Sequence, residues 1–213
     1  APEKISVIKH GIIPFNSSCG ELSTSVANLA GGKLIVCSLG SGSDYKGTDL
    51  LIRAWIESGL FQNNKCQLVI AGKMDRNIKA FLDDIVFKNN CNNIVCFDRY
   101  MSEKEMDFIA SNSRICALPY RRISQSGVLM SILPYRIPLI VTNVGGLSEP
   151  LTFGNIGVVV PAESISALSN ALKGYICPPK NLDALPLSNE WDAVLSEYSW
   201  VNISLKTIKV YFK

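Results

Sequence analysis

The chain has 213 residues, of which 47% are hydrophobic and 18% are charged. This is the composition of an ordinary globular protein, and it excludes a disordered, collagen-like or low-complexity chain. The formal net charge of +3 is too small to indicate nucleic acid or membrane as a partner, so we expect no nucleic-acid ligand. No apolar run approaches the roughly 18 residues of a membrane span.

The first half of the chain alternates between strand and helix patterns. Continuous apolar runs predict strands buried on both faces at Lys33–Leu39, Gln67–Ala71 and Asn93–Phe97. Apolar side chains at helical spacing predict one helix over Thr48–Leu60 and a second around the stripe Ile78, Phe81, Leu82, Ile85 and Val86. Ser102–Glu105 (SEKE) has the pattern of a capping box, which predicts a helix over Glu103–Ser111.

The second half continues the alternation and then departs from it. Further strands are predicted at Arg114–Tyr120, Pro138–Thr142 and Gly157–Val160, with helices at Gly127–Leu133 and Ser164–Tyr175. The stretch CPPKNLDALPLSNEW reads as a proline-bearing connector, after which Ser199 could cap a last helix, Trp200–Phe212. Repeated β-α units predict an α/β fold with a Rossmann-like, doubly wound parallel sheet of about six strands over 1–178, followed by a connector and C-terminal helix over 179–213.

The cysteines indicate the compartment of the protein, and the start of the chain indicates whether it is part of a longer one. There are seven cysteines, and no pair of them has CxxC spacing. Cys91 and Cys96 have no neighbouring histidine that could complete a zinc site. The odd number of cysteines without a paired spacing fits a reducing cytoplasm best. The chain lacks an initiator Met and opens directly into the strand-like run Ile5–Ile8 (ISVI), which predicts that it is part of a longer protein.

The first candidate site is the segment LGSGSDYKGTD after the first long strand. Gly40 and Gly42 begin like the dinucleotide motif GxGxxG, but Tyr45 stands at the third glycine. A phosphate loop fails as well, because Lys46 precedes Gly47. What remains is a Gly/Ser-rich turn with one lysine at a helix start, which is either an anion site or a flexible turn with a solvated lysine.

The second candidate site is the segment PYRRISQSGVLMSIL. No Asp or Glu occurs between Phe108 and Ser148, whereas Arg121 and Arg122 follow the end of a strand and Ser126 and Gly127 begin a helix. Arginines and a helix start suit a diphosphate. In the alternative interpretation, these arginines pair with acids elsewhere on the surface.

Other polar residues carry weaker signals. His10 has no nearby partner of a catalytic or metal-binding kind, so we expect a loop histidine with a structural hydrogen bond. Asp83 and Asp84 fall on the polar side of a helix and are expected to be solvated. No DxD motif occurs, so we expect no metal-diphosphate site of that type and no bound metal.

Short motifs occur in a fixed order along nearly the whole chain. They are Val7–Ile12, Tyr45–Gly47 with Asp49–Leu51, Gln67–Gly72, Phe97–Tyr100 with Glu105, Ala117–Tyr120, Ser126–Val128, Ile137–Ile140, Val144–Gly146 with Glu149, Gly157–Pro161, and Tyr198–Trp200 with Tyr211. The series resembles the C-terminal, donor-binding domain of retaining nucleotide-sugar glycosyltransferases of family four, which have the GT-B fold. Within it, Val7–Ile12 resembles the hinge strand that enters this domain.

The resemblance implies one half of a GT-B fold, with the N-terminal acceptor domain absent from this chain. It also implies a hexosyltransferase that uses a UDP- or GDP-linked sugar, needs no cofactor and transfers the sugar to a glycan or lipid-linked acceptor through the missing domain. The chain alone is then expected to be inactive, and the full protein to lie in the cytoplasm, free or peripheral at the inner membrane face. The last helix would cross to the missing domain, so Trp200, Ile203, Ile208 and Phe212 should not all be buried.

The resemblance also implies site residues. Lys46 would be the catalytic group, which neutralises the departing diphosphate. The residues expected to bind substrate are Gly40, Ser41, Lys46, Arg99, Tyr100, Arg121, Gln125, Ser126, Gly127, Val128 and Ser131.

Some positions depart from the family pattern. Ser41 stands where the family usually has an arginine, and Ile123 and Ser131 stand where it usually has two glutamates. This leaves open a variant donor site or a non-catalytic partner that keeps only the fold. A third hypothesis, a Rossmann dehydrogenase that binds NAD, is disfavoured by Tyr45 and by Gly72-Lys73 in place of an acidic residue after the second strand.

Overall fold

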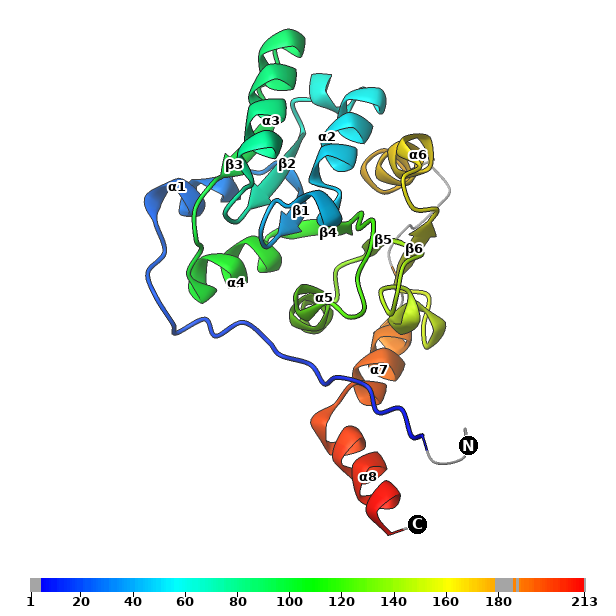
Figure 1. The fold of residues 1–213 in the computed structure, drawn as a ribbon. Coiled ribbons are helices and arrows are strands. Elements are labelled where there is room, and N and C mark those ends of the chain that lie inside the picture. Colours follow the sequence, from blue (N-terminus) through cyan, green and yellow to red (C-terminus); the bar gives the residue numbers. More distant parts are fainter. Residues whose placement is uncertain (1–4, 179–185, 187, 213) are drawn as a thin grey trace.

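The structure, a computed structural model, describes residues 5–178, 186 and 188–212. Six strands form one parallel sheet in the order β3-β2-β1-β4-β5-β6 (Figure 1). Their bounds are β1 Leu34–Leu39, β2 Cys66–Ala71, β3 Ile94–Phe97, β4 Ser113–Leu118, β5 Leu139–Thr142 and β6 Gly157–Val160. The predicted doubly wound sheet of about six strands is confirmed.

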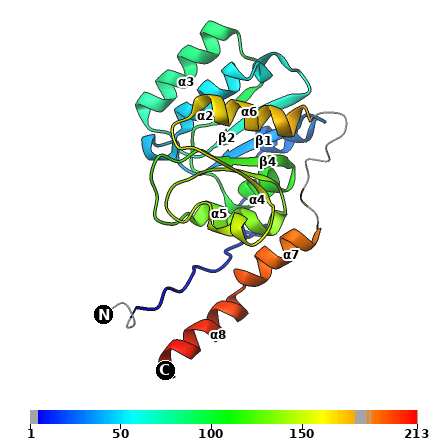
Figure 2. The same cartoon turned by 90° about the vertical axis from the view of Figure 1, so that its right-hand side faces the viewer.

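Helices cover both faces of the sheet (Figures 1 and 2). One face carries α2 (Thr48–Glu57), α3 (Arg76–Asn89) and α6 (Ile165–Ile176). The other carries α4 (Glu103–Ser111) and α5 (Gly127–Ile132), together with α1 (Thr24–Ala27) and α7 (Ser188–Glu197). Short 3-10 turns complete the described structure at η2 Asn28–Ala30, η3 Asp44–Lys46, η4 Leu60–Gln62, η5 Leu133–Tyr135 and η6 Glu149–Thr152.

Local signals in the sequence explain where several helices begin. The Ser102 hydroxyl accepts from the Glu105 backbone N–H at 3.2 Å, and the Glu105 carboxylate accepts in return from the Ser102 N–H at 3.2 Å. The predicted capping box of α4 is therefore confirmed. Ser164 and Ser199 cap α6 and α8 (Trp200–Tyr211) in the same way, by accepting from the backbone N–H three residues later.

The sheet order places a crevice between β1 and β4. These strands are neighbours, but the chain leaves β1 toward α2 on one face and leaves β4 toward α5 on the other. The segments after them, η3 and the start of α5, therefore diverge at the carboxyl ends of the strands. In open α/β sheets this switch point is where ligands bind.

Two sequence predictions near the chain ends are wrong. No strand forms at Ile5–Ile8 or over the hinge-like Val7–Ile12, because this segment pairs with no described strand; Val7 is 89% exposed. It runs as extended chain beside α7 and α8 (Figure 1), where the Ile12 N–H donates to the Tyr198 carbonyl at 3.1 Å. The predicted connector also contains α7, and its remaining residues 179–185 and 187 lie outside the described part.

The last helix exposes apolar side chains, as predicted. Ile203 is buried, but Trp200 is 57%, Ile208 50% and Phe212 87% exposed. Figure 2 shows α8 extending away from the body of the sheet and its covering helices. None of the helices in the described residues is both long and apolar enough to cross a membrane.

Candidate functional site

The lysine turn η3 is packed directly against the end of β4. Gly47 has φ +64°, a conformation that glycine adopts without strain, and it turns the chain from η3 into α2. A Cβ built on Gly47 would lie 2.1 Å from the Pro119 carbonyl oxygen. The turn can therefore lie against β4 only because this residue has no side chain.

This packing places the Lys46 amine in the crevice. A Cβ built on Gly40 would lie 2.6 Å from Lys46 Nζ and 3.2 Å from a methyl group of Val128. The amine thus sits between the end of β1 and the first turn of α5. Among the described residues it makes no hydrogen bond or ion pair, and burial lowers its pKa. Lys46 is a partly buried cation with no counter-charge from the residues that the structure describes.

The start of α5 faces the same crevice. Ser126 caps the helix, because its hydroxyl accepts from the Leu129 N–H at 3.2 Å and lies 3.4 Å from the Tyr120 hydroxyl. Gly127 is exposed, and a Cβ there would meet no atom within 4 Å. Within the described residues, the N–H groups of Gly127 and Val128 donate to no backbone group. The structure thus brings together Gly40, Lys46, Ser126, Gly127 and Val128.

The positive charge of Arg121 is paired with a carboxylate inside the protein. Its guanidinium donates two hydrogen bonds, of 2.7 and 2.8 Å, to the Asp49 carboxylate and a third, of 2.7 Å, to the Asp44 carbonyl. Its backbone N–H donates to the Tyr45 carbonyl at 2.8 Å. Burial alone would raise the pKa of Asp49, but the bonds from Arg121 outweigh it and lower that pKa. These bonds let Arg121 position the lysine turn, and its direct contact with substrate stays a prediction.

Arg99 is also paired with a carboxylate of the chain, that of Glu105. It donates to both oxygens of Glu105, at 2.6 and 2.7 Å, and to the Ser23 hydroxyl at 3.1 Å. It follows β3, which β2 separates from β1, so the structure does not bring Arg99 or the exposed Tyr100 next to Lys46. Of the remaining predicted residues, Ser41 and Gln125 are exposed and Ser131 is buried.

The Glu105 pair predicts a defined acid sensitivity. Hydrogen bonds from Arg99 lower the pKa of Glu105 from 4.5 to about 2, so the stabilisation is complete above pH 4.5 and is lost as the pH falls toward 2. Because Arg99 is partly exposed, we expect Glu105→Gln to lower the free energy of unfolding at pH 7 by about 2 kcal/mol. Urea unfolding from pH 7 to 3 should show this difference shrinking, whereas exposed Glu57→Gln should show none. A difference that stays constant with pH would contradict the assignment.

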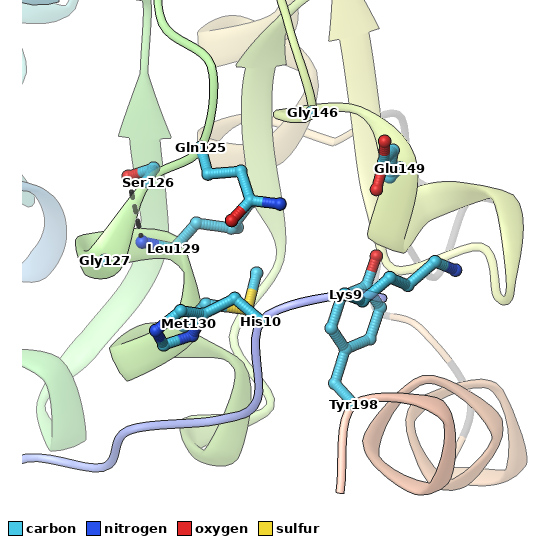
Figure 3. Close-up of a pocket in the computed structure, with 10 residues that line it drawn as sticks. All are labelled: Lys9, His10, Gln125, Ser126, Gly127, Leu129, Met130, Gly146, Glu149 and Tyr198. Atoms are coloured by element: carbon cyan, nitrogen blue, oxygen red, sulfur yellow. Dashed lines mark hydrogen bonds between the residues drawn. The ribbon is translucent and has the colours of Figure 1, made fainter. Parts of the chain in front are cut away.

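A cavity of about 210 Å³ lies beside the start of α5 (Figure 3). Gln125, Ser126 and Gly127 line it from one side, and Glu149 and Tyr198 from the other. Lys9 and His10 from the N-terminal segment also line it. Sequence reasoning did not select Lys9, Glu149 or Tyr198 as site residues, since only the fold brings these three segments together.

The remaining polar residues have structural partners. A ring nitrogen of His10 lies 2.7 Å from its neighbour's carbonyl oxygen, Gly11 O, which agrees with the expected structural hydrogen bond. Asp83 and Asp84 are exposed and pair with Lys79 and Lys88 one turn away. Within residues 5–178, 186 and 188–212, no group of three or more His, Cys, Asp or Glu side chains could hold a metal ion.

The comparison with protein families decides what kind of domain this is. Residues 22–185 match the family model described as glycosyl transferases group 1. The chain belongs to this family. An uncharacterized glycosyltransferase of Methanocaldococcus jannaschii is 23% identical over 98% of this chain and 54% of its own length. The lipopolysaccharide core biosynthesis mannosyltransferase LpcC of Rhizobium leguminosarum is 27% identical over 82% of this chain and 50% of its own length.

Solved structures of group 1 and related glycosyltransferases share the fold. A glycosyltransferase from Rickettsia africae superposes with a TM-score of 0.77 at 16% identity, over 99% of this chain and 57% of that one. The C-terminal domain of LpcC from Francisella tularensis superposes with a TM-score of 0.70 at 18% identity, over 85% of this chain and 95% of that domain. This chain therefore has the Rossmann-like C-terminal domain fold of GT-B glycosyltransferases, and it spans about half the length of the two relatives named above.

Proposed function

We propose that this chain is the donor-binding half of a retaining, metal-independent glycosyltransferase. The protein would transfer a hexose-type sugar from a UDP- or GDP-linked donor to a glycan or lipid-linked acceptor. The acceptor would bind through a further, N-terminal domain. Membership of the group 1 family supports the transferase class, and the geometry around Lys46 supports the site.

The observation that carries the proposal is the unpaired Lys46 amine at the switch point between β1 and β4. A desolvated cation without a counter-charge is unfavourable by itself and becomes favourable when an anion binds. The free N–H groups of Gly127 and Val128 on the other side of the crevice provide further donors for phosphate oxygens. A diphosphate between these two elements would satisfy both.

The same arrangement would assist the reaction. As the bond between sugar and diphosphate breaks, negative charge develops on the leaving phosphate oxygen. Lys46 and the two N–H groups are already in place, so stabilising this charge requires little reorganisation. The chain's own contribution to the reaction is therefore the binding and charge stabilisation of the diphosphate leaving group, while the acceptor has to be aligned from the other side of the cleft.

A second candidate function is a non-catalytic, nucleotide-binding partner of a glycosyltransferase. It is favoured by Ile123, which packs against the apolar core, and by the buried Ser131, because neither side chain can offer a carboxylate to the donor. Transfer from a nucleotide sugar by the full-length protein would exclude this alternative. Nucleotide binding without any turnover would favour it.

Calorimetric titration of UDP and GDP tests the proposed function and its independence of metal. We expect one of the two nucleotides to bind with the same Kd, within about twofold, in the presence of EDTA or of magnesium, because the positive charge comes from Lys46 and backbone N–H groups. Binding that is abolished by EDTA would contradict metal independence. A failure of both nucleotides to bind would contradict the donor site.

A further inference from the structure

The cavity beside α5 contains polar groups that the diphosphate site does not use. Tyr198 is buried, and its hydroxyl is a buried side-chain polar atom that finds no hydrogen-bond partner in the described part of the chain. In Figure 3 this hydroxyl points toward Glu149. Burying an unpaired hydroxyl is unfavourable, so the structure retains an unmet hydrogen-bonding group at the wall of a cavity.

Two more side chains reach the same space without partners. Glu149 and Gln125 extend toward the cavity from opposite sides (Figure 3). Both residues are exposed, and neither the Glu149 carboxylate nor the Gln125 amide makes a hydrogen bond or ion pair with any residue the structure describes. Burial, together with the charges of Glu149 and Glu197, raises the pKa of Tyr198, so its phenol remains protonated and can donate.

The chemistry of this set selects the ligand class. The Lys9 amine forms an ion pair with Glu197 at 3.1 Å and lies 3.7 Å from the centre of the Phe153 ring. Its charge is therefore already compensated, and we do not expect it to bind an anion. What remains is a carboxylate that accepts, with an amide and a phenol that can donate and accept, above a floor of Leu129 and Met130. Vicinal hydroxyl groups on a carbon ring match this combination.

The size of the cavity limits the ligand further. Its volume of about 210 Å³ is below the roughly 300–1,000 Å³ of sites for drug-sized ligands, so it suits a single ring and not a whole nucleotide. We propose that this cavity binds one monosaccharide ring, with Glu149, Gln125 and Tyr198 as its hydrogen-bonding residues. The inference rests on the proposed function in one respect: because the cavity adjoins Ser126 and Gly127, the ring is that of the sugar donor.

The test compares nucleotide sugars with the nucleotides alone. UDP, UDP-glucose, GDP and GDP-mannose are titrated into the parent chain, Tyr198→Phe and Glu149→Gln. We expect the Kd of the nucleoside diphosphate to stay within about twofold. The ratio of the nucleotide-sugar Kd to the diphosphate Kd should rise about three- to tenfold in Tyr198→Phe and about tenfold in Glu149→Gln. Tyr211→Phe and Glu57→Gln, which change exposed side chains elsewhere, are the matched controls.

Free glucose and mannose, followed by saturation-transfer NMR, identify the source of the ring. If the variants lose a free-sugar signal seen with the parent while the donor ratio is unchanged, the cavity still binds a monosaccharide, but one that belongs to the acceptor. The proposal is overturned if donor ratio and free-sugar binding are both unchanged in both variants. Failure of UDP and GDP to bind the parent would contradict the proposed function alone, since the free-sugar measurement tests the cavity separately. Thermal unfolding of each variant verifies that it is folded.

Discussion

Replacing Lys46 with alanine is expected to weaken binding of UDP or GDP about ten- to a hundredfold. The amine lies next to Gly40 and Val128 at the end of the sheet, and burial has already removed part of its hydration. A charge-assisted hydrogen bond from such a group contributes about 1.5–3 kcal/mol, which corresponds to this change in Kd. Calorimetric titration of the nucleotide into the parent and Lys46→Ala measures it directly.

The control for this experiment is Lys65→Ala. Lys65 precedes β2 at the amino-terminal edge of the sheet and is exposed, so its removal changes the net charge by the same amount without touching the crevice. We expect its Kd to stay within about twofold of the parent value. If Lys46→Ala and Lys65→Ala bind as tightly as the parent, the diphosphate does not bind at Lys46. An equal loss in both would indicate a long-range effect of charge, which added salt would screen.

The sheet could be predicted from the sequence because its signals are local. Strands buried on both faces need continuous apolar runs, and the six runs between Lys33 and Val160 that were expected to form the sheet became strands, whereas Ile5–Ile8 did not. Capping serines, Ser102 and Ser199, marked the starts of α4 and α8 for the same reason. The helix α7 was not predicted. Only Trp191 and Val194 form its buried face, which is too few for a clear helical pattern, and the helix follows a proline-bearing stretch.

The candidate site could be predicted only in part. Lys46 and Gly127 follow strands that end at the same edge of the sheet, so their approach is a consequence of topology. Arg121 was expected to bind substrate because no acid occurs near it in sequence, but its partner Asp49 lies 72 residues away. The cavity at Tyr198 joins three distant segments, and no local pattern in the sequence predicts such an arrangement.

The salt bridge between Arg121 and Asp49 is expected to be the most stabilising ion pair near the site. Its side chains are only 18% and 17% exposed, and it ties the η3 turn and α2 to the end of β4. Removing one partner leaves the other charge partly buried without compensation. We therefore expect Arg121→Met to lower the free energy of unfolding by about 3 kcal/mol. The Kd for nucleotide should also rise severalfold, because Lys46 loses the anchor of its turn.

The chain offers a matched pair for comparison. Arg136 and Asp192 lie 2.6 Å apart, as closely as Arg121 and Asp49 at 2.7 Å, but their side chains are 42% and 61% exposed. Solvent screening makes such a pair worth less than about 1 kcal/mol, so Arg136→Met should scarcely change stability or nucleotide binding. Urea unfolding and calorimetry on both variants, with Asp49→Asn to close a double-mutant cycle, separate the two roles. If Arg121→Met loses stability but binds nucleotide as the parent does, Arg121 supports the fold without positioning Lys46.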